Sequence, residues 1–202
     1  MTPQPSYRIF RAGWVMARAF TPHLLLAPLA YPWSVMSVAP GTLRRGLYLD
    51  STRTGMVMLY RSHQVIDAAL LVPIMFVAMA AYGAFAPVLT SFVLPDLMVA
   101  PVVVGVPLVF LVGLLFLLPR GGGSMFPFGP ETPKGQRWEV AGLAQLPGTK
   151  LTGIQLALRV VKQVPPSGAV VVATANSSKL VHQYQQFGFT EGMKNRVYKI
   201  VR

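Results

Sequence analysis

Few side chains in this sequence are of the types that carry metal or nucleophilic chemistry. The 202 residues include no cysteine, which excludes disulfides, thiolate metal sites and a cysteine nucleophile. The three histidines, His23, His63 and His182, lie far apart in the sequence. Histidine ligands of zinc usually follow a short, regular spacing, so this arrangement argues against a histidine-based metal site. Any chemistry must therefore use other side chains or the backbone.

Charge and apolar residues occupy different parts of the chain. The sequence is 53% apolar and yet carries a formal net charge of +12. From His63 to Pro119 there is no Lys or Arg, and the acidic residues there are Asp67 and Asp96. Seven arginines precede this stretch, and the other basic residues follow it. The chain therefore has an apolar middle between two basic flanks.

The apolar middle is long enough to predict a membrane hairpin. Two uncharged runs lie between Asp67 and Asp96 and between Asp96 and Arg120, and about 20 apolar residues suffice for a helix to cross a bilayer. We expect two transmembrane helices near 67–89 and 98–118. Arg53, Arg61 and Arg120 flank them, which predicts a multi-pass plasma (inner) membrane protein in the lipid bilayer with both termini in the cytoplasm.

The N-terminal region, residues 1–62, has several interpretations. Residues 12–40 are apolar but are interrupted by Arg18, His23 and prolines, which favours a basic segment at the membrane interface. A signal peptide is an alternative, although the apolar stretch starts late. In a third interpretation the region adds strands to the C-terminal domain, at Tyr7–Phe10 and Met56–Tyr60.

The C-terminal region has the pattern of an α/β domain. Residues 120–137 are rich in Gly and Pro and predict a linker between the hairpin region, 63–119, and a domain over 138–202. Within that domain, Ala169–Thr174 is a short β-branched run typical of a buried parallel strand. The expected order is strand, helix, strand, helix, strand, at Trp138–Leu146, Leu151–Val164, Ala169–Thr174, Ser177–Phe187 and Arg196–Val201. The predicted fold class is thus a membrane α-helical hairpin plus a small α/β domain.

This domain resembles the C-terminal half of the GNAT acetyltransferase superfamily. The most specific part is the string YQQFGF, from Tyr184 to Phe189, preceded by Asn176 after an apolar strand. The closing segment RVYKIVR also resembles the end of that family. The resemblance covers about residues 138–202, roughly half of a complete GNAT domain. The missing half implies either completion by residues 1–62 or a half-fold with an exposed edge that pairs with another chain.

The resemblance implies an acetyl-CoA site. In the family, a loop that leads into a helix binds the coenzyme A pyrophosphate through backbone N–H groups, and helix N-termini favour anions. The matching residues are Gly148, Thr149, Lys150 and Gly153. Gln155 departs from the family pattern, which prefers a very small residue at that position.

The resemblance also implies catalytic residues. Tyr184 matches the general acid that protonates the departing thiolate, Glu139 lies on the strand that often carries the general base, and Asn176 matches a residue near the pantetheine arm. Structural roles are equally open: Tyr184 as a core aromatic, Asn176 as a helix cap, and Lys150 as a solvated charge.

These observations lead to three functional hypotheses. The first is a membrane-anchored N-acetyltransferase that uses acetyl-CoA. The second is a non-catalytic accessory subunit whose GNAT-like domain docks in a larger membrane protein complex, or a homodimer. The third is nucleic-acid binding, prompted by the net charge of +12. The third is disfavoured, because much of the basic charge flanks the expected hairpin and no base-reading motif is present.

Overall fold

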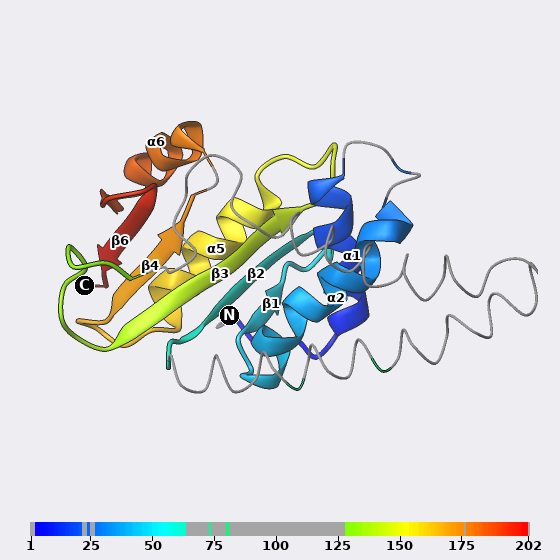
Figure 1. The fold of residues 1–202 in the computed structure, drawn as a ribbon, viewed down its shortest axis with the longest axis horizontal. Coiled ribbons are helices and arrows are strands. Elements are labelled where there is room, and N and C mark those ends of the chain that lie inside the picture. Colours follow the sequence, from blue (N-terminus) through cyan, green and yellow to red (C-terminus); the bar gives the residue numbers. More distant parts are fainter. Residues whose placement is uncertain are drawn as a thin grey trace, which may run out of the picture. The chain divides into compact units, whose positions relative to one another are not determined.

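The computed structural model describes residues 3–21, 24, 27–63, 128–175 and 177–201, together with residues 73 and 80. The chain divides into two units: Met1–His63 with Pro119–Arg202 forms one, and Gln64–Leu118 is assigned to the other. Everything below concerns the first unit. Its two parts, far apart in the sequence, build one α/β fold (Figure 1).

A mixed sheet of six strands forms the centre of this unit, in the order β1-β2-β3-β4-β6-β5. The pairs β1–β2, β2–β3, β4–β6 and β5–β6 are antiparallel, whereas β3 and β4 are parallel. The strands are β1 Leu47–Leu49, β2 Gly55–Arg61, β3 Arg137–Gln145, β4 Val170–Thr174, β5 Thr190–Glu191 and β6 Arg196–Ile200. Among the described residues, four helices accompany them: α1 Ile9–Phe20, α2 Ala27–Leu43, α5 Thr152–Gln163 and α6 Ser178–Gln186.

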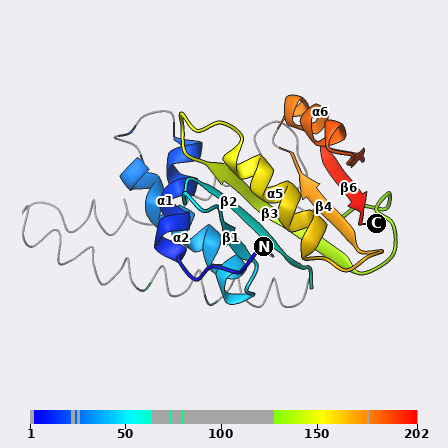
Figure 2. The same ribbon diagram turned by 180° about the vertical axis from the view of Figure 1, so that it is seen from behind.

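The N-terminal and C-terminal parts of the chain join between β2 and β3. Their register runs from Gly55 opposite Gln145 to Arg61 opposite Trp138. The ladder continues where the Ser62 N–H donates to the Arg137 carbonyl at 3.0 Å. The chain therefore leaves the sheet after β2 and returns to it directly opposite. The teal β2 and yellow-green β3 lie side by side in both views (Figures 1 and 2).

Helices α5 and α6 share one core with one face of the sheet. In β2, Val57 and Leu59 belong to this core, as alternation of side chains along a strand requires. From α5 the core takes Leu156 and Val160, and from α6 it takes Val181. Apolar residues at helical spacing thus give α5 and α6 the buried stripe that the sequence predicts.

Helices α1 and α2 belong to a second core on the opposite face. Met56 and Met58, which alternate with the residues above, pack there with Ala12 and Val15 of α1. The two helices contact each other closely at Gly13, where a Cβ atom would meet the Val35 Cγ2 atom at 2.5 Å. The apolar residues at the start of the chain therefore cover a sheet.

The predicted fold class is wrong. We expected a small α/β domain confined to 138–202 beside a membrane hairpin; the structure has one six-stranded sheet to which both ends of the chain contribute. The hairpin expected at 67–89 and 98–118 falls outside the described residues, apart from residues 73 and 80. Within the ranges described above, no helix combines the length and apolar character that a membrane crossing needs. The hairpin and the multi-pass plasma-membrane localisation are corrected on that finding and are not carried further.

Most of the predicted C-terminal elements are confirmed. Strands β3, β4 and β6 and helices α5 and α6 begin and end within about two residues of the expected bounds. The Ser177 hydroxyl caps α6 by accepting from the Leu180 N–H at 3.3 Å. Met56–Tyr60 lies in β2, as the third interpretation of residues 1–62 predicts. Tyr7–Phe10 is not a strand, because α1 begins at Ile9.

Candidate functional site

The parallel strands β3 and β4 stop pairing half-way along β3. They pair from Arg137 opposite Val170 to Val140 opposite Ala173, and β4 ends at Thr174. Beyond Val140, β3 continues to Gln145 with β2 on one side and no described strand on the other. Both views show the two arrows diverging (Figures 1 and 2). We call the space between 141–145 of β3 and the end of β4 the wedge.

A β-bulge marks the point where the wedge begins. The β2–β3 register shifts between Met58, which pairs with Gly142, and Leu59, which pairs with Val140. Ala141 is therefore the extra residue on β3. Bulges re-aim the backbone and are frequent next to active sites. Among the described residues, no strand pairs with the backbone groups of 141–145 that face the wedge.

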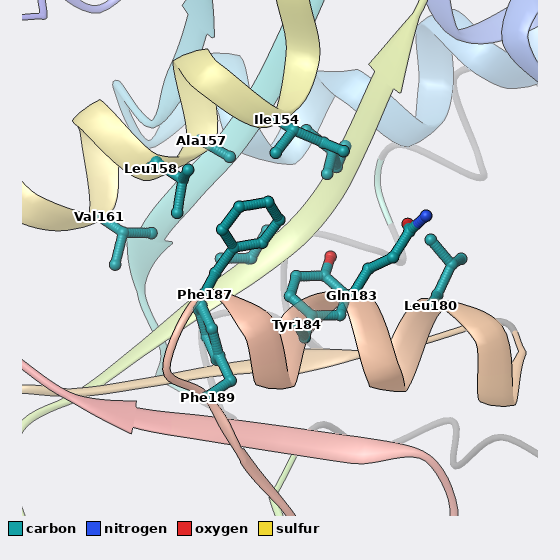
Figure 3. A pocket seen from close by; sticks show the side chains of 11 residues that line it. Ile154, Ala157, Leu158, Val161, Leu180, Gln183, Tyr184, Phe187 and Phe189 are labelled. Carbon is teal, nitrogen blue, oxygen red and sulfur yellow. The ribbon is translucent and has the colours of Figure 1, made fainter. Parts of the chain in front are cut away.

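A hollow opens over this part of β3, between α5 and α6 (Figure 3). Its cavity volume is about 30 Å³, and it is partly open to solvent. Val140 and Leu143 of β3 form its floor. The walls come from α5, α6 and the residues after α6: Ile154, Ala157, Leu158, Val161, Leu180, Gln183, Tyr184, Phe187 and Phe189. All the lining side chains are hydrocarbon except those of Gln183 and Tyr184.

Tyr184 brings a hydroxyl group into this apolar hollow. Its ring packs edge-on against Phe189, with the ring centroids 5.2 Å apart. Figure 3 shows the hydroxyl pointing from α6 toward α5, on the side of Ile154. No described residue forms a hydrogen bond with it, and burial raises the pKa of the Tyr184 phenol above its ordinary value. A phenol in this environment stays protonated at neutral pH and can donate to a ligand.

The loop from β3 to α5 leads into the helix that forms one wall of the hollow. The loop holds three of the predicted cofactor-binding residues, Gly148, Thr149 and Lys150, and Gly153 follows in the first turn of α5; Gly148 and Lys150 are exposed. The Thr149 hydroxyl donates to the Leu146 carbonyl at 2.6 Å, so this loop is ordered by its own contacts. Helix α5 begins at Thr152, and Ile154 in its first turn already lines the hollow. Of the predicted site residues, Tyr184 lines the hollow, whereas Gly148, Thr149, Lys150 and Gly153 are not among the residues that line it.

Gly153 has a packing role that fixes the position of this helix end. A Cβ atom at Gly153 would lie 3.1 Å from the Ala144 carbonyl oxygen of β3. On the neighbouring strand, a Cβ atom at Gly55 would lie 2.7 Å from the Gly153 nitrogen. Two glycines thus allow the first turn of α5 to rest directly on the sheet backbone.

The predicted catalytic pair is not brought together on one face. Trp138 and Val140 pack in the core beneath α5 and α6, so Glu139 between them points to the opposite face of the sheet. Tyr184 and Glu139 therefore lie on different sides of β3, close to where the wedge starts. Asn176 lies outside the described residues.

Gln145 is a residue of this site that sequence reasoning missed. At the end of β3, its Nε2 atom donates to the Thr149 carbonyl at 3.0 Å and its Oε1 atom accepts from the Gly153 N–H at 3.3 Å. No motif marks it, because its role depends on how the following loop folds back. Gln155, which departs from the family pattern, is exposed on α5.

Comparison with known proteins identifies no relative. No protein-family model matches the sequence, and no curated protein matches it significantly. Within the described part of the chain, no group of three or more His, Asp or Glu side chains is placed to hold a metal ion. The functional argument therefore rests on the geometry of the wedge and the hollow.

Proposed function

We propose that the α/β unit binds an acyl-coenzyme A in the wedge and the hollow and transfers the acyl group to an amine. The observation that carries this proposal is the Tyr184 hydroxyl, unpartnered among the described residues and directed into an apolar cavity where β3 loses its parallel neighbour. Because no described residue accepts a hydrogen bond from this hydroxyl, the hydroxyl is available to donate one to a ligand.

The shape of the site suits a pantetheine thioester. Pantetheine is an extended chain with amide groups, and residues 141–145 have backbone groups on the wedge side to which no strand of the described residues pairs. A peptide-like chain can add to such an edge as an extra strand would. The pyrophosphate of the coenzyme would then lie near Lys150 and the N-terminus of α5, which favours anions. The sequence feature behind this assignment is the YQQFGF string, from Tyr184 to Phe189.

The reaction would use the two faces of the sheet. The amine nitrogen attacks the thioester carbonyl carbon, the C–S bond breaks, and the coenzyme A thiolate leaves with the proton that Tyr184 donates. The attacking nitrogen becomes positively charged as the bond forms, and it loses one proton to a base to give the amide. Glu139 lies on the far face beside the wedge, so an amine that approaches from that face would meet this carboxylate.

The first experiment is calorimetric titration of the full-length protein with acetyl-CoA. Ile154→Trp should fill the hollow and abolish binding, whereas Gln155→Trp, exposed on the same turn of α5, should bind like the wild type. If folded wild-type protein does not bind acetyl-CoA, or if both variants bind equally well, the proposed site is wrong.

The second experiment separates binding from catalysis. Tyr184→Phe should keep acetyl-CoA affinity within a few-fold, because the hydroxyl is lost and the ring remains. Its rate of thiol release with an amine acceptor should fall roughly a hundredfold, the usual contribution of a general acid. Binding without any thiol release from the wild type, across primary amines and lysine peptides, would favour the alternative of a non-catalytic interaction domain. The Gln145 carboxamide, which already bonds to Thr149 of the β3–α5 loop and to Gly153 of α5, is the observation that favours this alternative.

A further inference from the structure

Positive charge dominates the N-terminal part of the unit. Residues 1–63 contain seven arginines and a single acidic residue, Asp50. Asp50 is buried, and its carboxylate accepts from the N–H groups of Thr54 and Gly55 at 2.7 Å each. Five of the arginines are exposed: Arg8, Arg11, Arg45, Arg53 and Arg61. This part of the chain therefore presents cations to its surroundings and keeps its one carboxylate inside.

Large apolar side chains are exposed on the same part of the chain. Among the described residues, eight large apolar side chains are exposed, and five of them precede β1: Tyr7, Phe10, Phe20, Leu24 and Leu43. Tyr7 and Phe10 are 65% and 68% exposed. Single exposed apolar side chains are ordinary, but a group of them marks a surface for interaction. Apolar groups and cations thus occur together outside the core.

Helix α1 places both kinds of side chain on one side. Ala12 and Val15 on its inner side pack in the second core. Four residues at the spacing i, i+1, i+4 and i+8 share the outer side, and Tyr7 precedes them by one turn. We call this surface the arginine–aromatic face: Tyr7, Phe10, Arg11, Trp14 and Arg18.

Neighbouring segments fix the arginine–aromatic face in place. The Trp14 ring packs edge-on against Tyr31 of α2, with the ring centroids 5.9 Å apart. The Tyr31 hydroxyl donates to the Phe10 carbonyl at 3.3 Å. Arg11 donates from Nε to the Arg53 carbonyl at 3.3 Å, which brings the loop between β1 and β2 beside the helix. The face is therefore part of the folded unit and has a further exposed arginine at its border.

We infer that the arginine–aromatic face binds the surface of an anionic lipid bilayer, with α1 lying along that surface. The guanidinium groups meet the lipid phosphates, and each arginine near such a surface strengthens attachment. The rings of Phe10 and Trp14 enter the headgroup region, where aromatic side chains are favourable. The attachment is peripheral, since α1 keeps its inner side on the sheet.

The apolar residues favour lipid over nucleic acid as the partner. Both partners supply the negative charge that the arginines require. A nucleic acid would use exposed rings for stacking on bases, but exposed leucines have no base-stacking role. Leu24 and Leu43 are 61% and 64% exposed and gain free energy on transfer to lipid. A bilayer surface therefore accounts for the cations, the rings and the aliphatic side chains together.

The test uses the absence of cysteine, which allows one introduced thiol to carry one environment-sensitive fluorophore. Full-length Phe10→Cys, labelled at that thiol, is mixed with vesicles of phosphatidylcholine alone or with about one third phosphatidylglycerol. The label should show a strong blue shift with the anionic vesicles and at most a small one with the neutral vesicles. Met193→Cys, at a residue that is 57% exposed between β5 and β6, is the matched control and should show neither.

A second variant tests the contribution of charge. Arg18→Gln, made in the labelled Phe10→Cys protein, should weaken binding to the anionic vesicles roughly fivefold, as expected for one arginine near such a surface. Lys162→Gln, which removes an exposed cation from α5, should leave binding unchanged. Added salt should weaken the binding of both proteins.

The inference has outcomes that overturn it. An equal response of the position 10 label to neutral and anionic vesicles, or one no larger than at position 193, contradicts it, as does unchanged binding in Arg18→Gln. A response to a single-stranded oligonucleotide without one to anionic vesicles would identify nucleic acid as the partner instead. The hollow belongs to the other face of the sheet, so acetyl-CoA titration tests the proposed function separately.

Discussion

The contact between the start of β2 and the first turn of α5 gives a sharp test of the fold around the site. Replacing Gly55 by alanine puts a Cβ atom 2.7 Å from the Gly153 nitrogen, 2.9 Å from the Thr152 carbonyl carbon and 3.0 Å from the Gly153 Cα atom. All three are backbone atoms, so no side chain can rotate away. Either β2 or the beginning of α5 has to move.

The magnitude follows from two opposing contributions. Overpacking of this kind costs about 1–3 kcal/mol, and a contact with backbone alone belongs at the upper end. Alanine loses less conformational entropy on folding than a strand glycine does, which stabilises the folded state by about 0.5–1 kcal/mol. Gly55→Ala should therefore lower the free energy of unfolding by about 2 kcal/mol. For a unit of this size that corresponds to a fall in Tm of roughly 6 °C.

Gly142→Ala is the matched control. It also lies in a strand, but its Cβ atom would meet the Cε atom at the end of the flexible Met58 side chain, at 2.5 Å. Met58 can change rotamer, so this variant should stay within about 0.5 kcal/mol of the wild type. Urea unfolding followed by circular dichroism measures both. A Gly55→Ala protein as stable as the wild type, or a larger loss in Gly142→Ala, would refute the close approach.

Two further predictions concern charged groups outside the hollow. Burial raises the pKa of Asp50, but hydrogen bonds from Thr52, Gly55 and Thr54 outweigh it and hold that pKa below its usual value, so stability present near pH 7 should be lost as the pH falls below about 4. Urea titrations at several pH values should show a weaker acid dependence in Asp50→Asn; an unchanged dependence would contradict the assignment. Arg196 donates from Nε to the Glu131 carboxylate at 2.7 Å, which ties the segment before β3 to β6. Arg196→Met should raise amide exchange and proteolysis around Glu131 more than Lys134→Met, which alters an exposed side chain nearby, and equal effects would count against this role.

The elements that sequence reasoning located correctly are those defined by local patterns. The β-branched run of β4 and the apolar spacing of α5 need no information from elsewhere in the chain. The short segment Tyr7–Phe10 was assigned wrongly, because four residues cannot separate a strand from the first turn of an amphipathic helix. Helix α2 contains Pro32 and Pro40, which made the region look broken in the sequence.

The pairing of β2 with β3 was left open because it is not local. No local pattern in the segment Gly55–Arg61 indicates that it pairs with Trp138, and the long apolar stretch between the two segments predicts a membrane hairpin instead. For the same reason no sequence motif indicates Gln145. Its importance comes from the distance at which the folded loop places Thr149 and Gly153.

The separation of β2 from β3 in the sequence has a consequence for how the protein is made. A chain that joins two antiparallel neighbours usually needs only a few residues, but here about 75 residues separate Arg61 from its partner Trp138. Counted as a flexible connection, closing that loop costs about 2 kcal/mol more than closing a five-residue turn. During synthesis, β2 leaves the ribosome long before β3. Until β3 follows, the edge of β2 that pairs with β3 has no partner strand. The time between the two strands is then a period in which the nascent chain is open to wrong partners.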